Sequence, residues 1–212
     1  MNKWITGFVM LLITGACTTT KQVKSENGWI DLFNKRSLDG WRASENPATF
    51  SVENGMIVVH GPRAHLFYNG PIKDHHFKDF ELSVKVMTTP GSNSGIFIHT
   101  QYQQTGWPSK GYEIQVNNSQ SDWRRTGSLY GIQDVKEVHV KDNEWFTESI
   151  MVKGKRIVIK INDKIVVDYT EPVNAAQFPD RGQKFLSGGT IALQGHDPDS
   201  KVYFKEIKLK VL

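Results

Sequence analysis

Short stretches of alternating apolar and polar residues, each closed by a turn, dominate the sequence beyond Gly28. Side chains on one face of a β-strand recur with a period of two, so this alternation predicts strands with one buried face. The clearest stretches are 50–59, 80–87, 95–101, 111–118, 148–152, 156–161, 165–169, 189–194 and 202–212. No segment sustains a helical period. The pattern predicts an all-β domain, a two-sheet jelly-roll sandwich of roughly a dozen strands.

The first residues have the features of a targeting segment rather than of this sandwich. Lys3 precedes an apolar stretch at 4–13, and the small residues 14–16 follow it. Such a stretch is too short to span a bilayer. The order of basic, apolar and small residues predicts a signal peptide over residues 1–16.

Cys17 is the only cysteine, and it stands directly after those small residues. This position indicates the lipid-modified first residue of a bacterial lipoprotein in the cell envelope, at the periplasm or outer membrane. The alternative is a secreted protein with an incidental cysteine. Residues 17–27 are polar and lack periodicity, which favours a lipidated tether. Residues 28–212 are then expected to form one domain, attached to the membrane by its lipid alone.

The charged residues give no sign of a nucleic-acid-binding surface. The formal net charge of the chain is +4, and the basic residues form no stripe. Clusters at 153–156 and 205–210 alternate with apolar residues, which is typical of solvated strand faces. Nucleic acid is therefore not an expected partner.

The predicted strand at 111–118 has an unusual polar face. Tyr112, Ile114 and Val116 form its apolar row, and the opposite row is Glu113, Gln115 and Asn117. Hydrogen-bonding side chains about 7 Å apart along a strand suit a ligand with many hydroxyl groups. The simpler alternative is an ordinary amphipathic strand.

Two further predicted strands carry similar polar residues opposite an apolar row. His99 belongs to the strand at 95–101, while Gln194 and His196 belong to the strand that begins at 189. If the three strands share a sheet, these side chains converge with those of 111–118. A lone strand histidine is more often a satisfied surface or core residue, but two histidines and a carboxylate on matching faces favour a site.

The long segments without a strand pattern are 102–110, 119–140 and 172–187. Such loops in a compact domain often carry binding residues. Trp107 and Tyr130 are candidates to stack on sugar rings, and Arg125 is a candidate to bind hydroxyl groups. The alternative is that these side chains pack the loops against the domain.

Carboxylates decide between two kinds of sugar protein. Laminarinase-type glucanases carry the pattern E-x-D-x-E, but here Gln115 and Asn117 follow Glu113 at the Asp and second Glu positions. Hydrolysis with retention needs two carboxyl groups about 5 Å apart. The domain therefore either binds sugars without cleaving them or cleaves them with a single base.

A resemblance to a known family is carried by the segments 28–34, 38–41, 65–68, 90–103, 111–118, 125–131, 144–148 and 191–198. Over these segments the sequence closely resembles the 3-keto-disaccharide hydrolase domain family, formerly a domain of unknown function. The resemblance implies a concanavalin A-like sandwich and an extracytoplasmic enzyme that cleaves 3-keto-glycosides. In some members of such families the cleavage is thought to be eliminative.

This chemistry needs one base, because a ketone at C3 makes the C2 proton acidic. The resulting enolate expels the C1 oxygen, and addition of water completes a net hydrolysis. The candidate bases are Glu113, His99 and His196, and the choice among them stays open. The candidate substrate-binding residues are Gln115, Asn117, Gln194, Arg125, Tyr130, Trp107 and His65.

Two alternatives remain at the level of sequence. No cofactor is expected, although His65, His99, Glu113 and His196 could together bind a divalent metal ion. Their spacing matches no metal-ligand signature. The second alternative is a non-catalytic carbohydrate-binding lipoprotein.

Overall fold

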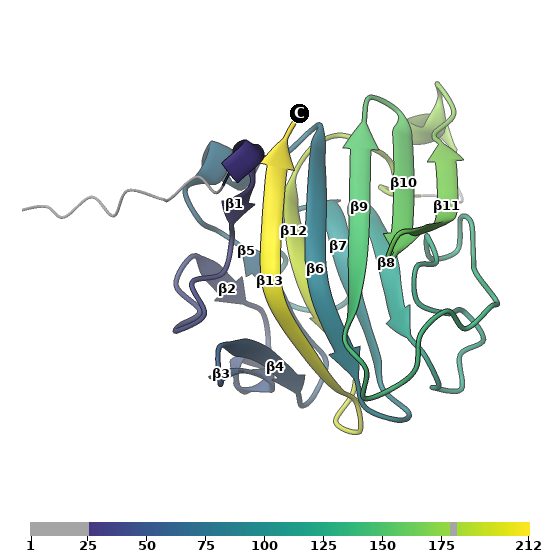
Figure 1. Ribbon diagram of the computed structural model, residues 1–212. Coiled ribbons are helices and arrows are strands. Elements are labelled where there is room, and N and C mark those ends of the chain that lie inside the picture. The colour runs from purple at the N-terminus through teal and green to yellow at the C-terminus, as the bar shows by residue number, and fades with distance from the viewer. Residues whose placement is uncertain (1–25, 179–181) are drawn as a thin grey trace, which may run out of the picture.

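The computed structural model describes residues 26–178 and 182–212, and in this part of the chain two antiparallel sheets pack face to face (Figure 1). The predicted signal peptide, Cys17 and most of the tether lie outside the described residues. No helix in the described part is long and apolar enough to cross a membrane.

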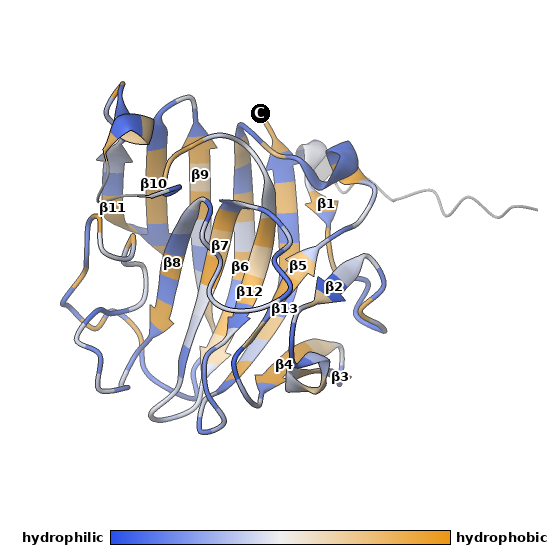
Figure 2. Ribbon diagram, turned by 180° about the vertical axis from the view of Figure 1, so that it is seen from behind, coloured by the Kyte–Doolittle hydropathy of each residue, from blue (hydrophilic) through white to orange (hydrophobic). Residues whose placement is uncertain are grey.

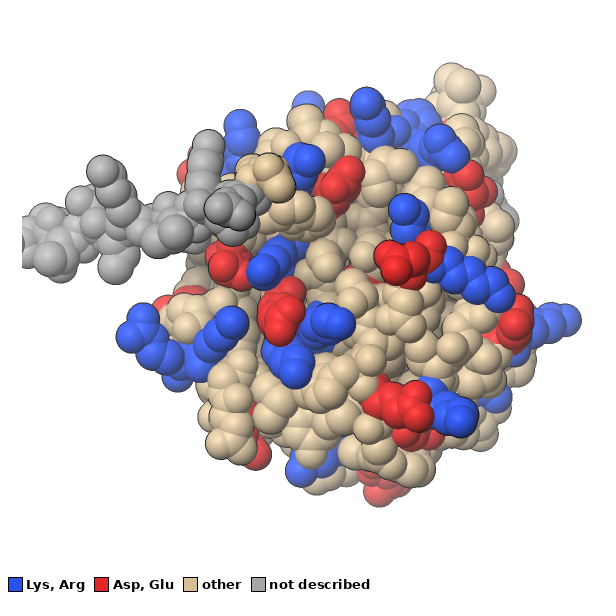
Figure 3. Space-filling model, in the orientation of Figure 1, with Lys and Arg blue, Asp and Glu red and all other residues tan. Residues whose placement is uncertain are grey.

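The larger sheet has eight strands. In spatial order they are β11 (Lys164–Thr170), β10 (Arg156–Ile161), β9 (Phe146–Lys153), β6 (Phe80–Thr88), β13 (Lys201–Val211), β4 (Met56–His60) and β3 (Phe50–Glu53), with β1 (Ile30–Asp31) beside β13. Basic and acidic side chains are interspersed over the face of the molecule that this sheet presents in Figure 3.

The smaller sheet has five strands. Their order is β2 (Trp41–Ala43), β5 (Ala64–Tyr68), β12 (Thr190–Gly195), β7 (Asn93–Thr100) and β8 (Tyr112–Asn117). Short 3₁₀ turns complete the described structure: η1 (Glu26–Gly28), η2 (Pro47–Thr49), η3 (Ile72–His75) and η4 (Ala175–Gln177). The all-β sandwich is confirmed, whereas the short strands β1, β2 and β5 were not predicted.

Strand periodicity explains the core between the sheets. In β6, Phe80, Leu82, Val84 and Val86 are fully buried, and the residues between them are partly exposed. Burying each such side chain stabilises the fold by about 1.5–3 kcal/mol. Residues 54 and 55 form the turn between β3 and β4, so the predicted strand at 50–59 is a hairpin.

The smaller sheet differs because both of its faces are buried. Every residue of β7 and β12 is buried, including those that point away from the core. Figure 2 shows the cause, since loops cross in front of this sheet. Phe67, Phe97 and Ala192 form a small apolar cluster on this outer face, against which Tyr102 packs.

Candidate functional site

The polar side chains of three neighbouring strands line a pocket on the outer face of the smaller sheet. Its volume is ≈ 290 Å³, near the lower end of the range for small-molecule sites. The strands β7, β8 and β12 and the loops around them contribute its walls. The lining residues are Asn93, Phe97, Trp107, Pro108, Gly111, Glu113, Gln115, Asp122, Tyr130, Lys184, Gln194 and His196.

Glu113 of β8 is the central carboxylate of this pocket. The side-chain amide of Gln194 on β12 donates a hydrogen bond of 2.7 Å to Oε1 of Glu113. Burial raises the pKa of Glu113 to about 7, although the Gln194 hydrogen bond and the charge of Lys184 oppose the rise. Near neutral pH the carboxyl group can therefore take up or release a proton.

Gly95 of β7 makes the contact between Glu113 and Gln194 possible. Gly95 pairs with Gln115 in the register of β7 and β8. A Cβ atom at position 95 would lie 2.7 Å from Oε1 of Glu113 and 3.1 Å from its Cγ. The missing side chain lets Glu113 cross β7 to reach β12. A glycine inside a strand often marks such a close approach, and this signal was present in the sequence.

Two side-chain carbonyl oxygens face this site without a hydrogen-bond partner among the described residues. Gln115 donates its amide to Oδ1 of Asn93 at 2.9 Å, which leaves Oε1 of Gln115 unpaired. Gln194 donates to Glu113, which leaves its own Oε1 unpaired. A buried acceptor without a partner is costly, so both oxygens are suited to accept hydrogen bonds from a polyhydroxylated ligand.

His196 follows β12 and forms a dyad with its neighbour Asp197. Nδ1 of His196 lies 2.6 Å from Oδ2 of Asp197, and Ser200 also donates hydrogen bonds to this carboxylate. Although burial alone would raise the pKa of Asp197, these hydrogen bonds lower it below its ordinary value. With Nδ1–H directed at Asp197, Nε2 of a neutral His196 is free to act as an acceptor.

Aromatic rings bound the pocket at two places. Trp107 is 44% exposed and lies 5.3 Å from the ring of His196. The guanidinium of Arg124 lies 4.6 Å from the ring centre of Tyr130. Of the predicted sugar-binding residues, Trp107, Tyr130, Gln115 and Gln194 do line the pocket.

His99 does not lie in the pocket, so the prediction that it shares a face with Glu113 is wrong. The register of β7 against β12 shifts between Thr190 and Ala192, and His99 has a positive φ of 52°. This irregularity turns its imidazole toward Phe80 of the larger sheet. Its Nε2 donates to the carbonyl of Lys78, and its Nδ1 accepts from the Gly188 N–H.

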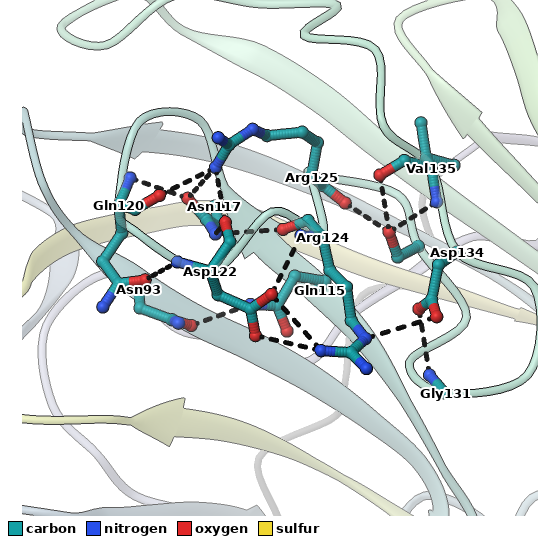
Figure 4. Close-up of polar contacts among 11 residues, drawn as sticks. Asn93, Gln115, Asn117, Gln120, Asp122, Arg124, Arg125, Gly131, Asp134 and Val135 are labelled. Atoms are coloured by element: carbon teal, nitrogen blue, oxygen red, sulfur yellow. Dashed lines mark hydrogen bonds and ion pairs between the residues drawn. The ribbon is translucent and has the colours of Figure 1, made fainter.

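Asn117 and Arg125 stabilise a loop instead of lining the pocket (Figure 4). The Asn117 amide donates to the carbonyls of Asp122 and Arg124, and its Oδ1 accepts from the guanidinium of Arg125. Arg125 also donates to the carbonyls of Gln120 and Asp122. The hydrogen bonds of both side chains therefore stabilise the loop at residues 117–125.

Asp122 lines the pocket, and sequence reasoning missed it because it lies in a loop without a pattern. Its Oδ1 accepts from the backbone N–H of Arg124 and lies 3.3 Å from Nη1 of the same residue. Arg124 also forms an ion pair with Asp134 (Figure 4). This network holds Asp122 as an ion-paired carboxylate, in contrast to Glu113.

The candidate metal ligands do not assemble into one site. Among the described residues no group of three or more His, Cys, Asp or Glu side chains is placed to hold a metal ion. His99 faces the core, and His65 is buried beneath Trp107. The alternative of a joint metal site at His65, His99, Glu113 and His196 is therefore contradicted.

Comparisons with known proteins agree with this architecture. A protein from Bacteroides thetaiotaomicron named 3-keto-disaccharide hydrolase is 26% identical over 232 residues, covering 88% of this chain and 79% of its own length. The crystal structure of a candidate glycosyl hydrolase from Parabacteroides distasonis superposes with a TM-score of 0.75 at 22% identity, covering 90% of this chain and 99% of its own.

A more distant neighbour shares only the fold. The endo-β-1,3(4)-glucanase SCLam of family GH16 has a TM-score of 0.57 at 14% identity, covering 86% of this chain and 91% of its own. The concanavalin A-like jelly roll is thereby confirmed. The profile described as a 3-keto-alpha-glucoside-1,2-lyase-like domain matches residues 28–210, and the chain belongs to this 3-keto-disaccharide hydrolase family.

Proposed function

We propose that this protein cleaves the glycosidic bond of 3-keto-glycosides, with Glu113 as the base that removes the C2 proton. The observation that carries the proposal is the Glu113 carboxyl group, which accepts a 2.7 Å hydrogen bond from Gln194 in a pocket lined by amides and aromatic rings, where burial raises its pKa to about 7. A base with a pKa near the working pH combines a useful ionised fraction with a strong affinity for the proton. The names of the family and of the relatives point to the same chemistry.

The side chains of the pocket and one water molecule account for every proton and electron pair in this reaction. Glu113 takes the C2 proton, and the electrons of the C2–H bond form an enolate whose oxygen is the former C3 ketone. The ammonium group of Lys184, which also lines the pocket, offsets the negative charge that develops. The enolate then forms the C1–C2 double bond and expels the C1 oxygen, which needs a proton. Addition of water across that bond gives net hydrolysis.

His196 is the group we assign to the leaving oxygen. It lies at the same pocket, and Asp197 orients its ring by the 2.6 Å hydrogen bond to Nδ1. A protonated Nε2 could donate to the departing oxygen and then, as the neutral form, activate water for the hydration step. The ion-paired Asp122 is held by Arg124 and has no role as a nucleophile in this scheme.

Glycosides with and without the C3 ketone test the proposal. Wild type should release the aglycone from a 3-keto-glucoside but not from the intact glucoside, and deuterium at C2 should exchange with water or slow the reaction. Glu113→Gln should reduce turnover by about 100-fold or more. Glu144→Gln is the matched control, because Glu144 is exposed and does not line the pocket. Cleavage of the intact glucoside with full retention of the label would refute the mechanism.

A non-catalytic sugar-binding protein is the second candidate. The unpaired carbonyl oxygens of Gln115 and Gln194 support this candidate, because they would bind sugar hydroxyl groups whether or not the glycosidic bond is cleaved. It predicts that both the 3-keto-glucoside and the intact glucoside bind, as measured by calorimetry, and that neither is cleaved.

We also propose that the protein is lipid-anchored in the bacterial cell envelope, on the basis of the leader and Cys17. Replacing Cys17 with Ser should release the protein from membranes into the soluble fraction. Failure of the parent protein to incorporate radiolabelled fatty acid in a producing bacterium would contradict this proposal.

A further inference from the structure

His65 is a buried imidazole whose two ring nitrogens have no hydrogen-bond partner among the described residues. It lies on β5 opposite Gln194 of β12, so its side chain is on the same sheet face as the pocket. Its neighbours are aromatic: the ring of Phe97 lies 5.3 Å away and that of Phe67 6.2 Å away. A leucine would fill this position without leaving two polar atoms unpaired. Packing alone therefore does not explain a histidine here.

Trp107 covers His65 and also forms a wall of the pocket. Its ring lies 5.6 Å from that of His65 and 5.3 Å from that of His196. The indole is 44% exposed, whereas the imidazole of His65 is fully buried. The partly exposed Trp107 thus contacts both the buried His65 and His196, which lines the pocket.

The segment that carries Trp107 is tied together internally, and its polar contacts with the rest of the domain are few. Gln103 donates to the carbonyls of Thr105 and Trp107 and accepts from Ser109, so residues 103–109 form one unit. The Gly106 N–H donates to Glu45 at 3.2 Å, and the guanidinium of Arg63 lies 5.4 Å from the indole. A partly exposed cation–π contact contributes little to stability, so the Trp107 side chain can be displaced even though the neighbouring Pro108 is buried.

We propose that residues 103–109 form a cover over a subsite, and that displacement of Trp107 lets His65 hydrogen-bond an oxygen of the bound sugar. The inference rests on the proposed function for the identity of the ligand. His65, Gln194 and Glu113 follow one another across the outer face from β5 to β8, and adjacent oxygen substituents of a pyranose ring would meet such a row. The imidazole offers one N–H donor and one acceptor, which suits a ketone or a hydroxyl group.

Burial keeps His65 in the neutral form that this role needs. Burial lowers the pKa of His65 to about 4; the carboxylate of Glu45 opposes this effect, and the charges of Arg63 and His196 add to it. Because burial is the main cause, removing the cover should raise the pKa toward the ordinary value of about 6.5. A histidine titration in Trp107→Ala, followed by NMR, tests this without any substrate. If the pKa of His65 stays near 4 in this variant, the proposal that residues 103–109 cover His65 is overturned.

The subsite is tested by binding to the slow Glu113→Gln protein, with methyl 3-keto-glucoside as the probe in calorimetry. Adding His65→Leu should raise the dissociation constant by at least about tenfold while leaving the melting temperature equal or higher, because an unpaired polar group has been removed. His65→Gln should recover part of the affinity, since its amide can replace the imidazole as donor.

The outcomes separate this inference from the proposed function. Unchanged affinity in His65→Leu, with the probe bound normally by the parent protein, overturns the subsite alone. If the parent protein binds neither the 3-keto-glucoside nor the intact glucoside, the proposed function and the subsite are overturned together. If His65→Leu fails to fold, the comparison of His65→Gln with His65→Asn still tests the subsite. Only glutamine places a donor near the position of Nε2, so equal affinities in these two variants would overturn the subsite.

Discussion

Removing the hydrogen bond between Gln194 and Glu113 should shift the pH dependence of cleavage to higher pH. The Gln194 amide donates to Oε1 of Glu113 at 2.7 Å and lowers the pKa of a carboxyl group that burial raises. Gln194→Met keeps a side chain of similar length but removes the donor. The ionised form of Glu113 loses its partner, and its pKa should rise above the wild-type value of about 7.

The size of the shift follows from the strength of that bond. A hydrogen bond to a charged group contributes about 1.5–3 kcal/mol, and one pKa unit corresponds to about 1.4 kcal/mol. The shift is therefore about one to two units. Because the base acts only when ionised, kcat/KM of Gln194→Met at pH 6 should be about 10 to 100 times lower than that of wild type. The difference between the two proteins should shrink as the pH approaches about 9.

The assay is the pH profile of kcat/KM for release of the aglycone from a 3-keto-glucoside. Gln115→Met is the matched control, since Gln115 is on the same strand face but its amide bonds to Asn93. That variant should weaken binding without moving the acidic limb of the profile. If the limb of Gln194→Met coincides with that of wild type, then Glu113 is not the base or the Gln194 bond does not control its pKa.

Three further changes test other parts of the structure. Gly95→Ala should fold, as circular dichroism would show, but should lower kcat/KM by about tenfold or more, because the new Cβ displaces Glu113. An unchanged kcat/KM would contradict this expectation. Burial raises the pKa of Glu148 well above its ordinary value, so stability should decrease as the pH rises from about 4. Glu148→Gln should remove part of that decrease in urea unfolding, and equal slopes would contradict it. His99→Leu should cost about 1–3 kcal/mol of stability yet leave the pH profile unmoved.

The expected effects at Glu148 and His99 have different physical causes. A carboxyl group that binds its proton more tightly in the folded state stabilises the fold below its unfolded pKa and loses that contribution as the pH rises. Glu148, fully buried in the core, belongs to this class, and Glu113 adds a similar term between about 4.5 and about 7. His99 has hydrogen-bond partners at both ring nitrogens, so its removal leaves the carbonyl of Lys78 and the N–H of Gly188 unpaired.

Strand periodicity was sufficient to predict the convergence of Glu113, Gln115, Gln194 and His196, which the structure confirms. It failed for His99 because a register irregularity in β7 reverses the face of the residues beyond it. A period of two carries no information about such an irregularity. Asp122 and Lys184 could not be predicted either, since both lie in loops whose position depends on the whole fold.

For Asn117 and Gln115 the sequence predicted the correct face of the sheet but not the role of each side chain. The usual reading of a polar strand face assumes that this face meets water. Here loops bury most of it, so each polar atom must find a partner in the protein or in a ligand. Asn117 uses its amide and carbonyl groups on the loop, whereas Gln115 retains an unpaired carbonyl oxygen. Only the packing of the loops separates a structural amide from one that is available to a sugar.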